Sequence, residues 1–446
     1  MMEVENRRQV MGKSKADKQE IRLEVLFVIA IGIYMFIWSV LKPFNYAPDE
    51  QMRYDLPLYI YNHGRLPLGD DPEIRNQIWG FSYAFMPTWL EPIIAAFFMH
   101  VVSIFGASEF KLVVAARFVS VLSISGMVYC LARTLDRLFS RRVKWMTLIL
   151  ISMLPQITFL GSYVNQDSLN LLGTSIILLS WVCGIHDGWN YKNGLLLSAG
   201  IIVVSLSYYF GYGWILGSIF FFFITHLLQI GPNKPDKKMW KVTALICILV
   251  LGVVSFFFIR NLVIYHGDLL GRASMGAAQS RYATTEMKPE NRLSLMSQGV
   301  PFVYFLISRE WWRSTLNSFI GCFGYMQYPV PGWIWVTYFL MFLLFITIFI
   351  VSTAKLAYNK CKSEVVFRAF IILEFVIPII LSLWYSYSSD YQAQGRYIMS
   401  LIPALTIESA VGIAAIDKRK NIVTVILTGI VVVLALYSFI GVYLPS

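Results

Sequence analysis

Charged residues are scarce in this sequence. Asp, Glu, Lys and Arg make up 14% of its 446 residues, whereas a soluble globular protein averages about 25%. Apolar residues make up 57% of the chain, and apolar runs of about 20 residues, long enough to cross a bilayer as a helix, recur along it. This composition excludes an ordinary soluble protein and predicts an all-α polytopic membrane protein.

Cysteine is also rare. The five cysteines are scattered, and none stands in a CxxC or zinc-binding spacing, so the sequence predicts neither a disulfide framework nor a metal cluster. The net charge of +11 could indicate nucleic-acid binding, but the basic residues fall in short clusters between apolar runs, as membrane topology requires. We therefore expect no nucleic-acid partner. The chain also lacks a convincing internal repeat, which weighs against transporters built from inverted repeats.

The basic clusters indicate which loops face the cytoplasm. They are Arg7 to Arg22, Arg133 to Lys144, Lys234 to Lys241, Lys355 to Arg368 and Lys418 to Lys420. The positive-inside rule places all of them on the cytoplasmic side, but the count of crossings fails if residues 84–105 span the membrane. That segment carries two prolines, Glu91 and His100, so we predict that it lies along the outer surface as an amphipathic helix.

About 11 transmembrane helices then satisfy the rule, with the N-terminus inside and the C-terminus outside. The predicted spans are residues 22–41, 111–134, 144–161, 168–186, 194–210, 213–230, 241–260, 333–353, 366–386, 398–415 and 421–443. Residues 1–21 are predicted to be a cytoplasmic basic N-terminus, and residues 22–443 a single transmembrane domain whose first span is a retained signal anchor. Two long external loops remain, residues 42–110 and 262–332, and loops of this length are usually functional. We expect interfacial helices in the first loop, and an active-site roof formed by both loops.

The unusual polar residues gather on the external face of this topology. Asp49 and Glu50 follow the first span, and Asp167 lies at the outer mouth between two later spans. Other polar side chains expected at the same depth are Arg117, Arg260, Asn261, Gln394, Arg396 and Tyr397. A carboxylate could deprotonate an acceptor hydroxyl as a general base, and arginines could bind a lipid-linked phosphate in bidentate fashion. This set suits transfer of a sugar from a polyprenyl phosphate, with inversion at the anomeric carbon.

Each of these residues also has a purely structural interpretation. Asp49 and Glu50 could cap a surface helix, and Asp167 could cap the span that follows it. An isolated arginine could extend to the lipid headgroups. His63 lies near the acid pair but could belong to a turn. The functional interpretation gains weight because so few charged residues are placed on this face and they are expected at one depth.

Four segments occur in a recognisable order: PDEQMRY followed by NHGRLP, then SYVNQDSLN, IRNLVIYHGD and AQGRYIMSLIPAL. In this order they resemble the GT-C superfamily of glycosyltransferases, multispan membrane enzymes that use lipid-phosphate-linked sugars. Within that superfamily they look like one bacterial branch, and the resemblance runs from about residue 22 to about residue 440. It implies a GT-C-like fold.

The resemblance also implies roles for individual residues. Asp49 would be the base that activates the acceptor, and Glu50 would position Asp49 or the acceptor. Asp167 matches an acid of the second external loop that helps to hold the site and, in some relatives, touches a metal. Arg260 and Arg396 match basic residues that bind the donor phosphate.

One position departs from the pattern of this branch. Members commonly carry a histidine three residues after the PDE motif, where this chain has Arg53. An arginine cannot ligate a metal or shuttle a proton, so the departure weakens the expectation of a metal site and favours anion binding by Arg53. No cofactor is therefore required, although a divalent metal held by Asp49 and Asp167 is left open. Arg117 completes the predicted phosphate-binding set.

The sequence thus predicts an integral membrane glycosyltransferase. It would move a sugar from a polyprenyl-phosphate donor to an extracytoplasmic glycan or lipid-linked acceptor, at the outer face of a bacterial plasma membrane. Gln394, Tyr397, Asn261 and His63 are the candidates for positioning the substrate. The alternatives are a flippase for a lipid-linked saccharide, which the intramembrane acids Glu374 and Glu408 would favour, and a non-catalytic partner in envelope assembly.

Overall fold

The computed structural model describes residues 15–230, 237–307, 309–358, 362–417 and 421–446. The helices that form the long spans are α1 (Lys15–Leu41), α4 (Glu109–Leu138), α7 (Asp167–Asp187), α9 (Tyr212–Ile230), α10 (Lys237–Ile264), α14 (Gly332–Tyr358), α15 (Lys362–Ser388), α16 (Ile402–Asp417) and α17 (Asn421–Tyr437). The shorter helices are α2 (Glu50–His63), α3 (Leu90–Ser103), α5 (Arg141–Ser152), α6 (Pro155–Leu160), α8 (Tyr191–Ser205), α11 (Arg272–Tyr282), α12 (Phe302–Ile307) and α13 (Arg309–Ile320).

Short turns and one hairpin complete the described chain. The 3-10 turns are η2 (Tyr83–Phe85), η3 (Tyr209–Gly211), η4 (Thr285–Met287), η5 (Pro289–Asn291) and η6 (Gly395–Leu401), and η7 (Ser438–Tyr443) is a π turn. The strands β1 (Cys322–Phe323) and β2 (Tyr328–Pro329) pair antiparallel. The predicted all-α class is confirmed, and the roof loops contain helices rather than unstructured chain.

Nine helices in the described residues are long and apolar enough to span a membrane. Each coincides with one of the 11 predicted spans, but the other two predicted spans are shorter helices, so the count of 11 is not confirmed. The predicted span 144–161 divides into α5 and α6 at Pro155, which occupies the first turn of α6 and lacks the N–H that would continue α5. The predicted span 194–210 stops at Ser205, which leaves α8 about 22 Å long.

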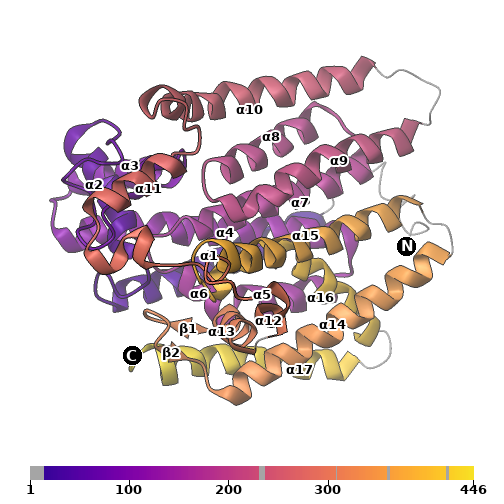
Figure 1. The fold of residues 1–446 in the computed structure, drawn as a ribbon. Helices are drawn as coiled ribbons and strands as arrows, with labels where there is room; N and C mark the ends of the chain where they lie inside the picture. The colour runs from indigo at the N-terminus through magenta and orange to yellow at the C-terminus, as the bar shows by residue number, and fades with distance from the viewer. Residues whose placement is uncertain (1–14, 231–236, 308, 359–361, 418–420) are drawn as a thin grey trace.

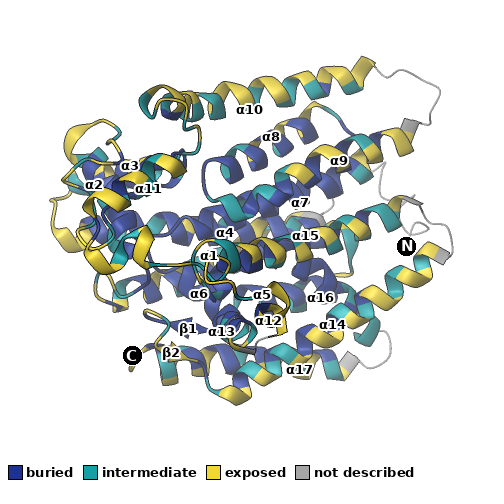
Figure 2. Ribbon diagram, viewed as in Figure 1, coloured by how far each residue is buried: buried dark blue, intermediate teal, exposed yellow. Residues whose placement is uncertain are grey.

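The long helices pack as a bundle, and buried residues are concentrated in its centre (Figure 1, Figure 2). In the α16 segment 83% of the most apolar window is buried, whereas in α10 that share is 6%. Helix α10 therefore lies at the edge of the bundle, against α8, and exposes its apolar side chains as a lipid-facing helix does. Helices α4, α7 and α16 form the interior.

The first long loop forms a cap at one end of the bundle. Helices α2 and α3 lie together there, beside α11 (Figure 1). As predicted, the apolar segment 84–105 contains a short helix rather than a span, since α3 has only 14 residues. Its exposed apolar side chains, Ile93, Phe97 and Val101, recur every four residues and form one stripe.

A buried ionic network joins α1, α4 and α5. The ammonium of Lys144, which is fully buried, lies 2.7 Å from Glu24 Oε1 and 3.0 Å from Asp136 Oδ1. Arg133 lies 2.9 Å from Glu24 Oε2. Part of the basic cluster that the topology argument used is therefore neutralised by acidic side chains within the fold.

Candidate functional site

An ion pair joins the start of α2 to the start of η6, although its partners are 347 positions apart in the sequence. Arg396 Nη2 donates to Asp49 Oδ2 at 2.6 Å. The Asp49 side chain is 28% exposed, whereas that of Arg396 is 7% exposed. Asp49 has a left-handed backbone, with φ 61°, a conformation that costs a non-glycine residue free energy and is concentrated at functional sites. The cap thus holds a strained acid over a buried arginine.

Arg53 and Asp167 lie beside this pair. Both side chains are 3% exposed, and each guanidinium, that of Arg53 and that of Arg396, lies within electrostatic range of Asp49 and Asp167. Arg53 Nε and Nη1, Arg396 Nε and Nη1, and Asp167 Oδ2 are buried without a hydrogen-bond partner in the described residues. Unpaired buried polar atoms are costly, so these point to a ligand that would pair them.

Four of the predicted residues are therefore brought together: Asp49, Arg53, Asp167 and Arg396. We call them the acid–arginine cluster. Two of the predicted positioning residues adjoin it. The Tyr397 hydroxyl accepts a hydrogen bond from Arg396 Nη2 at 3.1 Å, and Gln394 immediately precedes η6. Gln394 Oε1 has no partner in the described part of the chain, so it too is available to a ligand.

The Glu50 carboxylate is fully occupied by partners that are not members of the cluster. Its carboxylate accepts from Arg117 Nε at 2.7 Å and from Arg117 Nη2 at 3.0 Å. It also accepts from the backbone N–H groups of Asn45 at 2.9 Å and Val164 at 3.3 Å. Glu50 thus fixes the backbone next to Asp49, so it can position Asp49, but its oxygens are not free to meet an acceptor.

The prediction that Arg117 binds the donor phosphate does not fit its contacts. Besides Glu50, its Nη1 and Nη2 donate to the backbone carbonyls of Ser39, Lys42 and Pro43 at 2.6–2.9 Å. All five N–H bonds of a guanidinium are used by these contacts. Arg117 joins the end of α1 to α2 and has no donor left for a phosphate.

Arg260 and Asn261 bond to a chain segment that adjoins the cluster and not to the cluster itself. Arg260 Nη2 donates to the carbonyl of Pro67 at 2.7 Å, and Asn261 Nδ2 donates to the carbonyl of Phe85 at 2.7 Å. Both contacts fasten residues 65–86, which we call the strap, to the end of α10. These two residues hold the strap, and in the described residues their hydrogen bonds go to the strap and not to the cluster.

His63 is not part of the cluster. It lies at the opposite end of α2 from Asp49, about 20 Å along the helix. Its Nε2 contacts Glu73 Oε2 at 2.8 Å, and its side chain is 38% exposed. His63 therefore lies at the helix end before the turn at Gly64, as its structural interpretation expects, and the structure does not bring it to the cluster.

Three residues that the sequence argument did not select adjoin the cluster. The ring of Tyr83, on the strap, lies 4.6 Å from the guanidinium carbon of Arg53, and that of Tyr208 lies 5.7 Å from it. Glu91, in the first turn of α3, lies within electrostatic range of Arg53. The sequence did carry a signal for Glu91, an acid in an otherwise apolar segment, but we used it to exclude a span.

The two guanidinium groups determine the charge state of Asp49. Burial alone would raise the pKa of Asp49, but the charges of Arg396 and Arg53, with the hydrogen bond from Arg396, hold that pKa below its usual value. Asp49 is therefore an ionised carboxylate over the ordinary pH range. An anion bound to Arg396 would offset the positive charge that acts on Asp49. The pKa of Asp49 would then rise, and Asp49 would become a stronger base.

The residues present do not fit a divalent metal at Asp49 and Asp167. Asp49 is already paired with Arg396, and both acids lie in the field of two guanidinium groups, which repel a cation. In the described residues, no three His, Cys, Asp or Glu side chains are grouped so that they could hold a metal ion. We assign no metal to this site.

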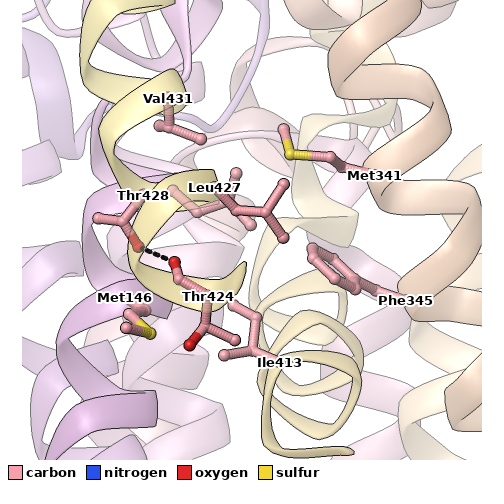
Figure 3. A pocket seen from close by; sticks show the side chains of 9 residues that line it. Met146, Met341, Phe345, Ile413, Thr424, Leu427, Thr428 and Val431 are labelled. Carbon is pink, nitrogen blue, oxygen red and sulfur yellow. Dashed lines mark hydrogen bonds between the residues drawn. The ribbon is translucent and has the colours of Figure 1, made fainter. Parts of the chain in front are cut away.

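A separate pocket lies between α5, α14, α16 and α17 (Figure 3). It is lined by Met146, Leu150, Met341, Phe345, Ile413, Thr424, Leu427, Thr428 and Val431. Its only polar side chains are two threonines, and the Thr428 hydroxyl already donates to the Thr424 carbonyl at 2.9 Å. The pocket has no titratable lining residue, so it offers no chemistry comparable to that of the acid–arginine cluster.

Solved structures share this fold. The oligosaccharyltransferase of the archaeon Archaeoglobus fulgidus, in a complex with Zn and sulfate, aligns with a TM-score of 0.54 at 14% identity, over 92% of this chain and 52% of its own. The same protein with an inhibitory peptide and a dolichol-phosphate aligns with a TM-score of 0.53 at 12% identity, over 94% and 54%. The chain thus spans about half the length of the structures it matches. These are GT-C proteins, so the predicted GT-C-like fold is confirmed.

The sequence comparisons are more limited. No curated protein matches the chain. A family model described as "Predicted membrane protein (DUF2142)" matches residues 75–405, which are 331 of the 446 residues. The matched part includes Asp167 and Arg396 and begins after Asp49. The chain belongs to this DUF2142 family of predicted membrane proteins.

Proposed function

We propose that this protein is a membrane glycosyltransferase that transfers a sugar from a polyprenyl-phosphate donor to a hydroxyl of an extracytoplasmic acceptor. The observation that carries the proposal is the acid–arginine cluster. It combines an ionised carboxylate with two buried guanidinium groups whose nitrogens are partly unpaired. The GT-C-like fold supports it, since a protein of that fold binds a dolichol-phosphate.

The residues divide the chemistry between them. Arg396 and Arg53 bind the phosphate of the donor and stabilise the negative charge that develops as it leaves. Asp49 accepts the proton of the acceptor hydroxyl, whose oxygen attacks the anomeric carbon. The bond from that carbon to the phosphate oxygen breaks, and its electron pair stays on the phosphate. Attack from the face opposite the phosphate inverts the anomeric centre.

Asp167 and the neighbouring residues complete the site. Asp167 lies near both guanidinium groups and balances part of their positive charge when no donor is bound. Tyr397 and Gln394 provide hydroxyl and amide groups at the mouth of the site for the sugar. We place this site on the extracytoplasmic face of a bacterial plasma membrane, where the positive-inside argument puts the α2–α3 cap.

The test is transfer by the purified protein in lipid nanodiscs supplied with defined polyprenyl-phosphate sugars and a panel of glycan and lipid-linked acceptors. Asp49→Asn should lose turnover by about 10²-fold or more, the usual contribution of a general base, while it still binds the donor. Arg396→Ala should instead lose donor affinity. Full turnover by both variants would reject the site, and no transfer by the wild type from any donor would reject the function.

Glu374 supports a second candidate, a flippase. This acid lies in α15 within a candidate span, is fully buried, and has neither oxygen hydrogen-bonded in the described residues. Intramembrane acids often mark a transport path. Reconstitution of the purified protein in sealed vesicles separates the two candidates. A flippase moves labelled lipid-linked sugar between the leaflets without forming a new glycosidic bond, whereas a glycosyltransferase forms that bond.

A further inference from the structure

Glu91 is a buried acid for which the described fold provides no partner. Its side chain has no exposed area, and neither carboxyl oxygen has a hydrogen-bond partner among the described residues. It lies in the first turn of α3, in the cap. A structural acid in such a position is normally satisfied, as Glu50 is by Arg117 and two backbone N–H groups.

The backbone around Glu91 fixes where its side chain can act. Leu90 N–H donates to the Leu206 carbonyl at 3.3 Å, which ties the start of α3 to the end of α8. Gln166 Nε2 donates to the Thr88 carbonyl at 3.1 Å, which ties the same segment to the residue before Asp167. The first turn of α3 is therefore held next to the residue that precedes Asp167 of the acid–arginine cluster.

Arg53 connects Glu91 to that cluster. It is the charged group that acts most strongly on Glu91, yet the two make no ion pair within 4 Å among the described residues. Arg53 Nε and Nη1 remain unpaired and buried. A guanidinium with unpaired N–H groups and a carboxyl with unpaired oxygens, within electrostatic range of each other, suit a ligand that accepts from both. Phosphate oxygens accept such hydrogen bonds, provided that the carboxyl is protonated.

We propose that Glu91 binds the lipid-linked phosphate as a neutral carboxylic acid, donating its O–H to a phosphate oxygen beside Arg53. The inference rests on the proposed function and extends it with a residue and a protonation state. An ionised Glu91 would repel the phosphate and would also compete for Arg53. A neutral Glu91 adds a donor without adding a further positive charge to those of Arg53 and Arg396, so it leaves the phosphate free to depart.

The groups that face this position set its titration. Arg53 is the charged group that acts on Glu91 directly. Arg53 in turn lies in the field of Tyr83, Asp167, Tyr208 and Asp49, and Arg396 acts on Asp49 and Asp167. Arg260, from α10, lies over the ring of Trp89, close to Glu91 in the sequence. Burial raises the pKa of Glu91 to about 8, and the positive charge of Arg53 only partly opposes this shift. A phosphate bound to Arg53 would weaken that opposition and hold the proton more firmly.

The experiment measures binding of polyprenyl methyl phosphate to the full-length protein in nanodiscs between pH 6 and pH 9.5. This probe is a phosphodiester, so its own charge does not change over that range. Because the protonated fraction of a group with a pKa of about 8 falls from about 0.9 to about 0.1 between pH 7 and pH 9, the wild-type Kd should rise about tenfold over that interval. Glu91→Gln keeps a neutral donor, so it should bind as the wild type does at pH 7 and should lose the dependence on pH.

A matched control is Glu374→Gln, which removes another buried, unpaired carboxyl, far along the chain in α15. It should keep the wild-type pH profile. The inference is overturned if Glu91→Gln keeps the tenfold rise, if Glu374→Gln abolishes it, or if the wild type binds the probe equally at pH 7 and pH 9. Absence of wild-type binding at every pH would reject the proposed function itself, and the role of Glu91 with it.

Discussion

The two adjacent acids of the PDE motif should respond to mutation in different ways. Glu50 is fully buried and accepts four hydrogen bonds, two of them from Arg117, which is 3% exposed. Removal of one partner from a buried ion pair leaves an uncompensated charge and costs about 3–5 kcal/mol. Glu50→Gln should therefore lower the free energy of unfolding by about that amount, even though its side chain is nearly the same size.

The neighbouring acid provides the matched control. Asp49 is 28% exposed and accepts hydrogen bonds from Arg396 and from Tyr83. Asn at this position keeps an acceptor oxygen for Arg396, and Asp167 still balances part of its charge, so Asp49→Asn should lower the free energy of unfolding by about 1–2 kcal/mol at most. The structure thus predicts that Glu50 contributes mainly to the stability of the fold and Asp49 mainly to turnover.

A double-mutant cycle measures the pair directly. The variants are Glu50→Gln, Arg117→Gln and the double variant, each unfolded by SDS titration in mixed micelles and followed by circular dichroism. The coupling energy should be about 2–3 kcal/mol, at the upper end of what contacting residues show. A Glu50→Gln protein within about 1 kcal/mol of the wild type, with no coupling to Arg117 but with lost turnover, would refute this reasoning and return Glu50 to the chemistry.

Two further outcomes follow from the contacts of the site. Arg396→Ala removes the positive charge that, against burial, holds the pKa of Asp49 low. Because that pKa should rise in the variant, the acid limb of the turnover–pH profile should move to higher pH. An unmoved limb would mean that Asp49 is not the titrating base. Asn261→Ala removes the hydrogen bond from α10 to the Phe85 carbonyl. Amide hydrogen exchange in the strap should become about tenfold faster, because the strap loses about 1–1.5 kcal/mol of local stability. Unchanged exchange would show that Asn261 does not hold the strap.

The sequence identified the cluster better than it identified the role of each member. Asp49, Asp167 and Arg396 were selected from their expected depth in the membrane, and Arg53 from its departure from the family pattern; the structure brings the four together. Arg117 was selected on the same argument but is used up in fixing the end of α1. Depth is encoded in hydropathy, whereas the direction in which a side chain points at a given depth depends on how the helices are rotated against one another.

The same limit explains the residues that were missed. Tyr83 and Tyr208 belong to segments without regular periodicity, and their rings meet Arg53 only because the strap and the α8–α9 turn fold over the start of α2. Arg260 and Asn261 lie at the expected end of α10, and each donates a hydrogen bond to a backbone carbonyl of the strap. Loop paths of this kind are set by long-range contacts, to which local sequence patterns are insensitive.

The amino-acid sequence by itself determined that this protein folds as a helical membrane protein, and it determined the approximate positions of the nine candidate membrane spans among the described residues. These follow from the free energy of placing apolar or charged side chains in lipid, which sums along the chain without reference to its partners. The tertiary structure alone decided which acid is neutralised by Arg117 and which is exposed beside Arg396, and where α8 stops. Those outcomes depend on pairing between side chains hundreds of residues apart, and such pairs are specified only once the helices have packed.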